Sequence, residues 1–171
     1  MVDGRGPVVT GPTRKTRTEV AARDEGCCVA CGRQVVDPES LAPWSNWSLQ
    51  HRVARGMGGS RTAWINTPVN LVTVCGDGTS GCHGEIESRR EWARNCGYAV
   101  PQWADPVEVP VLHWTHGWSW IRPSGWVPLT VPELRLQAAQ WLADAERAPG
   151  ADPIRLSRQA TAMFGLTEEA A

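Results

Sequence analysis

Four cysteines fall into two clusters with the spacing of a structural zinc site. Cys28 and Cys31 form a C-x2-C pair, and Cys75 and Cys82 form a C-x6-C pair. Two thiolates separated by two residues reach one metal from a tight turn, and Gly32 permits that turn. Because four sulfur ligands leave zinc no open coordination position, this metal is expected to close a long loop and not to activate water.

Two alternatives remain open around these cysteines. Cys27 lies directly before Cys28 in CCVACG, and it is interpreted as a small buried apolar residue because only Cys28 has the two-residue spacing. Disulfides compete with zinc binding. The N-terminal sequence lacks the apolar core of a signal peptide, and no apolar run is long enough for a membrane span. We therefore expect a cytoplasmic protein without a membrane partner, in which reduced cysteines favour metal binding.

A second group of residues has the chemistry needed to hydrolyse a phosphodiester. That reaction needs a base for the attacking water and a divalent cation to stabilise the developing negative charge. A neutral imidazole such as that of His51 suits the first task. His83 and Glu87, four residues apart, would share one helical face and could both reach one cation. Asn70 could hold the intervening loop by hydrogen bonds and so fix the orientation of the base.

Short strands and one helix must position these residues. Residues 47–53 alternate as a strand does, and residues 71–75 form a β-prone run that would return antiparallel to it. A helix is expected to begin at His83 and to end at Gly97. The sequence therefore predicts two strands followed by a helix around the candidate catalytic residues.

The segment RGMGGS, residues 55–60, is predicted to be a loop that approaches a phosphodiester closely. Three of four consecutive residues, 56–59, are glycines. Arg52, Arg55 and Arg61 bracket the loop, as expected for residues that hold a DNA or RNA backbone. The formal net charge is only -1, with 17 Lys and Arg against 18 Asp and Glu. Overall charge therefore does not itself indicate a nucleic-acid partner.

With 171 residues, the chain has room for one active module and an appendage. We expect an α+β fold in four parts. Residues 1–15 form a flexible N-terminal arm, and residues 16–97 form the zinc-containing core, which opens with a short helix. Residues 98–129 form a Trp-rich β-hairpin appendage, and residues 130–171 form a C-terminal helical segment.

Aromatic and histidine side chains of the hairpin region are expected to have structural or solvated roles. Of the chain's ten tryptophans, those in this region are expected to pack on one another and not to stack on bases. His113 and His116 have no cysteine or carboxylate pair beside them, so they are interpreted as solvated hairpin residues.

The order of these motifs resembles the HNH endonuclease family of actinobacterial and phage type over residues 16–97. The resemblance rests on C-x2-C, a strand histidine followed by RGMGG, NTPVNLVTVC and GCHGEIES. It implies a ββα-metal fold with structural Zn2+, in which His51 is the general base, Asn70 braces the loop and His83 binds Mg2+ or another divalent cation such as Mn2+ or Ni2+. It also implies DNA as the partner and, if the protein is phage-encoded, the terminase.

Gln50 departs from the family pattern. Many relatives carry Asp, Glu or His immediately before the catalytic histidine, as a further metal ligand, whereas the Gln50 carbonyl oxygen is a neutral and weaker donor. Glu87 could supply the missing charge. Two alternatives to a full endonuclease follow. One is a catalytically weak or inactive nucleic-acid-binding module that is stabilised by zinc. The other is a zinc-ribbon protein whose histidines only pack.

Overall fold

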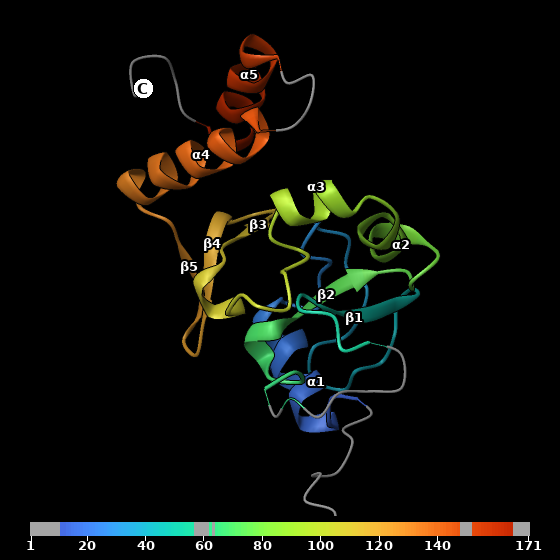
Figure 1. Ribbon diagram of the computed structural model, residues 1–171. Coiled ribbons are helices and arrows are strands. Elements are labelled where there is room, and N and C mark those ends of the chain that lie inside the picture. Colours follow the sequence, from blue (N-terminus) through green and yellow to red (C-terminus); the bar gives the residue numbers. More distant parts are fainter. Residues whose placement is uncertain (1–10, 57–61, 63, 148–151, 166–171) are drawn as a thin grey trace, which may run out of the picture. The chain divides into compact units, whose positions relative to one another are not determined.

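The computed structural model describes residues 11–56, 62, 64–147 and 152–165 (Figure 1). The chain divides into two compact units, with the boundary between Val127 and Pro128. Most of the arm predicted over residues 1–15 therefore lies outside the described residues. The part that is described leads into a helix that begins at Arg14. Small antiparallel sheets and helices together confirm the α+β class.

The first unit is built around a pair of strands. β1 (Trp47–His51) and β2 (Leu71–Cys75) pair antiparallel, with Trp47 opposite Cys75 and His51 opposite Leu71, as the sequence predicted. β1 is two residues shorter than expected, because Val53 leaves β2 and pairs with Val100 instead. The pair places the end of β1, with His51, opposite the start of β2.

β2 is buried along its whole length. α1 (Arg14–Arg23) and α2 (Gly81–Ser88) both contact it, and all five of its residues are buried. Val20 of α1, Leu49 and Leu71 form one apolar cluster. This burial explains why residues 71–75 read as a nearly continuous apolar run, since a strand covered on both faces has no polar side.

The helix predicted from His83 to Gly97 is two helices. α2 begins two residues earlier, at Gly81, and α3 spans Arg90–Asn95. The break falls at Arg89, where the backbone has φ -112° and ψ 62°. The predicted end at Gly97 has a clear cause: its φ is +74°, and a Cβ there would lie 1.9 Å from the Pro110 carbonyl oxygen. Position 89 holds neither Gly nor Pro, so no helix-breaking residue marks the break in the sequence.

A second, three-stranded sheet follows in the order β3 (Val111–His113), β4 (Gly117–Arg122) and β5 (Gly125–Pro128). Here the expectation of two solvated histidines is wrong for His113, which is 5 % exposed. Its Nδ1 accepts hydrogen bonds from the backbone N–H groups of Thr115 and His116, at 3.1 and 3.2 Å. The ring therefore closes the β3–β4 turn.

The second unit consists of two helices, α4 (Val131–Glu146) and α5 (Pro153–Phe164), which contact each other. α4 starts at a capping box, in which the Glu133 carboxylate accepts from the backbone N–H of Thr130 at 2.7 Å. Trp141 and Phe164 meet edge to face with their ring centroids 6.5 Å apart. Among the helices described, none combines the length and the apolar character needed to cross a membrane.

Candidate functional site

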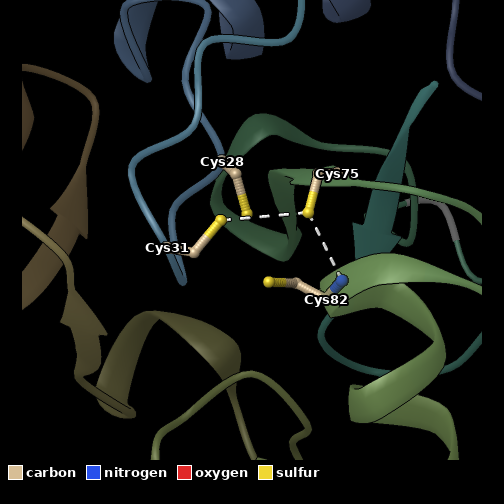
Figure 2. Close-up of side chains that lie close together, drawn as sticks. All are labelled: Cys28, Cys31, Cys75 and Cys82. Carbon is tan, nitrogen blue, oxygen red and sulfur yellow. Dashed lines mark hydrogen bonds between the residues drawn. The ribbon is translucent and has the colours of Figure 1, made fainter. Parts of the chain in front are cut away.

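The four predicted cysteines converge on one point. The sulfur atoms of Cys28, Cys31, Cys75 and Cys82 all lie within 4.8 Å of one another, and Figure 2 shows the four side chains directed into a common space. The Cys31 and Cys75 sulfurs are 3.9 Å apart. Tetrahedral zinc, with bonds of about 2.3 Å, would space its sulfur ligands about 3.8 Å apart. The residues present therefore fit a metal ion such as structural zinc.

Three separate segments deliver these sulfurs. Cys28 and Cys31 flank a turn that closes with a hydrogen bond from Gly32 N to Cys28 O, at 2.8 Å. Cys75 ends β2, and Cys82 is the second residue of α2. Gly32 has φ +74°, and a Cβ there would lie 2.4 Å from the ring of Trp114, so this position requires glycine. A bound metal would thus join the turn, the strand and the helix.

Cys27 lies outside this cluster, as its spacing predicted, but it is half-buried and not the buried residue expected. Its sulfur lies 3.5 Å from the Glu25 carbonyl oxygen. Within the cluster, burial raises the pKa of the Cys28 thiol to about 12. Burial also acts to raise the pKa of Cys75, but hydrogen bonds from Cys82, Cys31 and Cys28 outweigh it and lower that pKa. Cys28 and Cys75 are buried, Cys82 is half-buried and Cys31 is exposed. A dication would stabilise all four as thiolates.

A separate open cleft of about 690 Å³ lies where β1 meets α2. It is lined by most of the residues that the sequence singled out for chemistry, namely Gln50, His51, His83 and Glu87. Three arginines also line it: Arg17, Arg55 and Arg90. The structure thus brings both candidate histidines to one cavity. The thiol cluster contributes no lining residue to this cavity, so the two sites predicted from the sequence are distinct.

Hydrogen bonding fixes the His83 imidazole in one tautomer. Its Nδ1 lies 2.6 Å from Ser48 Oγ, and Ser48 donates its only proton to the Gly76 carbonyl at 2.8 Å. Ser48 must therefore accept from Nδ1–H, which leaves Nε2 with a free lone pair. Nε2 lies 4.0 Å from Glu87 Oε1. Ser48 carried no signal in the sequence, because a strand serine is ordinary.

Glu87 is held from its other side. Its Oε2 pairs with Arg90 of α3, while Oε1 faces His83. An imidazole nitrogen and a carboxylate oxygen suit Mn2+ or Ni2+ better than Mg2+, which prefers an all-oxygen shell. The predicted sharing of one helical face by His83 and Glu87 is therefore present, and the pair fits one divalent cation.

His51, at the end of β1, lines the same cleft as His83 and Glu87. Its Nε2 is hydrogen-bonded to Asn66 Oδ1 at 2.8 Å. Burial lowers the pKa of His51, the Asn66 hydrogen bond partly opposes this, and the positive charge of Arg55 lowers the pKa further. The pKa of His83 is also lowered by burial, against the opposing effect of Glu87. Both imidazoles are therefore neutral at pH 7.

Asn70 and Gln50 are both buried next to His51. The Asn70 side chain accepts from Val53 N at 2.7 Å and donates to the carbonyls of Val53 and Ile65, at 3.1 and 2.9 Å. It therefore ties together the two ends of the loop that follows β1. Gln50 is 3 % exposed, and its Nε2 donates to the His51 carbonyl at 3.0 Å. That bond ties the amide to the backbone of His51 and not to its imidazole.

The three arginines predicted to contact nucleic acid are Arg52, Arg55 and Arg61, and the two that the structure describes differ in their placement. Arg52 is 1 % exposed, and its guanidinium donates to the carbonyls of Gly97, Pro106 and Val109. It is therefore a core residue and cannot reach a phosphate, which corrects its assignment as a nucleic-acid contact. The alternating pattern of residues 47–53 did not reveal that the Arg52 side chain points to the side that the rest of the fold buries.

Arg55 is exposed at the cleft, as expected, whereas Arg61 lies outside the described residues. Arg17, which the sequence did not single out, also lines the cleft. It lies in α1 and stacks on the Trp47 ring with 4.8 Å between its guanidinium carbon and the ring centroid. Helical position alone gave no reason to connect Arg17 with His51.

Comparison with protein-family models, with curated proteins and with solved structures gives no match. What this site can do is therefore inferred from its own geometry and chemistry.

Proposed function

We propose that this protein is a metal-dependent endonuclease of the HNH type, which hydrolyses phosphodiester bonds of DNA and is stabilised by structural zinc. One observation carries the proposal: a neutral imidazole and a His–Glu pair line the same cleft. His51 supplies a base, and His83 with Glu87 supplies ligands for a cation. These are the two groups that phosphodiester hydrolysis needs.

Each residue has a defined task in this proposal. A cation held by His83 Nε2 and Glu87 would stabilise negative charge on the phosphate. Neutral His51 would accept a proton from water as its oxygen attacks phosphorus and the bond to the leaving oxygen breaks. Arg90 would keep the Glu87 carboxylate in place through its ion pair. Asn70 would hold the loop behind the base by its backbone hydrogen bonds.

Two arginines would position the substrate. Arg17 and Arg55 line the cleft and suit contact with backbone phosphates. Such contacts fix where the nucleic acid lies but do not read its sequence. The cleft chemistry recognises a phosphodiester; DNA as the substrate follows from the resemblance to HNH endonucleases. We expect cleavage with little sequence specificity, because contacts from these arginines to backbone phosphates carry no sequence information.

Gln50 favours a second candidate, a nucleic-acid-binding module that cleaves slowly or not at all. Its side chain is neutral, and its amide donates to the His51 carbonyl. It therefore adds no charge to the cation site, in which Glu87 would be the only carboxylate among the described lining residues. Binding to DNA would then survive without hydrolysis.

A plasmid-nicking assay on the zinc-loaded protein separates the two candidates. The parent, His51→Ala and the matched control His116→Ala are compared with Mg2+, Mn2+ and Ni2+, because His116 is exposed and outside the cleft. We expect the parent and the control to nick DNA, and His51→Ala to lose activity by about 10²- to 10⁴-fold. Equal nicking by all three proteins would reject the endonuclease, and DNA binding without nicking would favour the binding module.

A further inference from the structure

Asn66 is the one side chain hydrogen-bonded to the His51 imidazole among the described residues. Its Oδ1 lies 2.8 Å from His51 Nε2. It lies in the segment between Ile65 and Pro68, just before the short 3-10 helix Pro68–Asn70 that leads into β2. This loop contact spans 15 residues of sequence, so no local helix or turn geometry imposes it.

The partner atom determines where the imidazole proton resides. A carbonyl oxygen can only accept, so His51 Nε2 must carry the hydrogen. In the neutral ring, Nδ1 is then the nitrogen with a free lone pair, and His51 lines the cleft. A base can take a proton only at its unprotonated nitrogen. The hydrogen bond to Asn66 therefore decides which imidazole nitrogen can accept the proton from water.

Asn66 and the nearby Asn70 do different work. The Asn70 amide is occupied entirely with backbone groups, those of Val53 and Ile65. Asn66 directs its oxygen to the imidazole, and its buried Nδ2 has no hydrogen-bond partner. A buried amide that leaves a donor unpaired costs stability, so folding alone gives no reason for asparagine at this position.

We propose that Asn66 is a positioning residue that holds His51 in the Nε2–H tautomer, with Nδ1 as the atom that accepts the proton from water. This inference rests on the proposed endonuclease function. It assigns to Asn66 an orienting role like that of the third group in a nucleophile–base–orienter arrangement. Asn70 remains the brace of the loop, and Asn66 aims the base.

The first test reads the tautomer without any activity. Imidazole ¹⁵N resonances are recorded at about pH 8, where neutral histidine prevails. The chain has four histidines, so the spectrum of His51→Ala assigns the His51 signals. We expect the proton on Nε2 in the parent and in Asn66→Asp, and a mixture of tautomers in Asn66→Ala. A proton on Nδ1 in the parent would overturn the proposal, as would an unchanged tautomer in Asn66→Ala.

The second test measures cleavage by the same variants. We expect Asn66→Ala to lower kcat by roughly 10- to 100-fold, part of what a general base supplies, with KM for DNA changed by no more than about twofold. Asn66→Asp keeps an acceptor oxygen at the same place and should restore most of kcat. If Asn66→Ala matched the parent, the positioning role would be rejected while the endonuclease stood. If the parent failed to nick DNA, the endonuclease would be rejected, and the tautomer measurement would still decide the role of Asn66. Thermal unfolding of each variant verifies that it is folded.

Discussion

The hydroxyl of Ser48 accepts a hydrogen bond from His83 Nδ1 at 2.6 Å and passes its own proton to the Gly76 carbonyl. A strand residue thereby fixes the ring on α2. Partners that orient a metal-binding histidine typically contribute about 10- to 100-fold to metal affinity. The geometry of β1 would therefore be coupled to the proposed cation site on the helix.

Replacing Ser48 by Ala should weaken Mn2+ binding by about 10- to 100-fold, because the His83 ring would be free to rotate and to change tautomer. Titration calorimetry on the zinc-loaded protein measures this. Ser45→Ala is the matched control, since the buried Ser45 hydroxyl has no hydrogen-bond partner. Equal losses in the two variants would mean that the Ser48 bond to His83 does not orient the ligand.

Replacing Glu87 by Gln should weaken Mn2+ binding and cleavage together, because the cation site loses the carboxylate that faces His83. Glu85→Gln is the control, since Glu85 lies on the same helix but pairs with Arg89 outside the cleft. Calorimetry and the nicking assay provide the two measurements. Tight Mn2+ binding by Glu87→Gln would exclude the carboxylate as a ligand.

Removing one thiol of the cluster should unfold the first unit. We expect Cys28→Ala to lose its zinc. The free energy of unfolding should then fall by an amount comparable to the whole stability of a small domain, about 5 to 15 kcal/mol. Cys27→Ala, which alters a neighbouring thiol outside the cluster, should retain one zinc and the parent's unfolding transition. Zinc content by mass spectrometry and near-UV circular dichroism distinguish the two. A stable, zinc-free Cys28→Ala protein would deny the metal its structural role.

The two neighbouring arginines should have separable effects. Arg52→Ala leaves three buried carbonyls without their donor, so the free energy of unfolding should fall by about 3 kcal/mol or more. Arg55→Ala should leave stability unchanged within about 0.5 kcal/mol and should reduce the salt dependence of DNA binding by about one phosphate contact. Urea unfolding and binding at several salt concentrations test this. A reversed pattern would place Arg52 at the substrate and Arg55 in the core.

Acid should destabilise the β3–β4 turn through His113. Burial, helped by His116, lowers the pKa of His113 to about 4, from about 6.5 in an unfolded chain. Between these two pKa values the unfolded state binds more protons than the folded state. The stability that neutral His113 contributes is therefore complete above about pH 6.5 and declines as the pH falls toward 4. His113→Asn offers an acceptor oxygen that does not titrate, so its unfolding free energy should decline less with acid than the parent's. Parallel pH curves would contradict this.

The sequence was most informative where one residue type has one job. Cysteine spacing selected all four members of the cluster, and the β-prone run ending at Cys75 gave the correct strand pairing. Glycine at position 97 marked a helix end that a close approach to Pro110 enforces. In each case a local rule of geometry or chemistry agreed with the fold.

The sequence was least informative where burial decides the role. Arg52 and Arg55 look equivalent in the chain, but only the packing of residues 97–109 around Arg52 makes it a core residue. Ser48 of β1 meets its histidine partner on α2, and Asn66 reaches His51 from a loop 15 residues away in sequence. Long-range hydrogen bonds of this kind leave no periodic trace in a sequence.

The hydrogen bonds of the Arg52 guanidinium show that the smallest fragment expected to fold must extend beyond Gly97. Its acceptors at Pro106 and Val109 follow the ββα segment, and Trp126 of β5 donates to Asp24, at the end of α1, at 3.1 Å. A fragment that stopped at Gly97 would keep a cation in its interior and lose two of these three carbonyls. The region after Gly97 is therefore part of the scaffold that holds Arg52, the residue next to His51, and its loss is expected to disturb the position of His51.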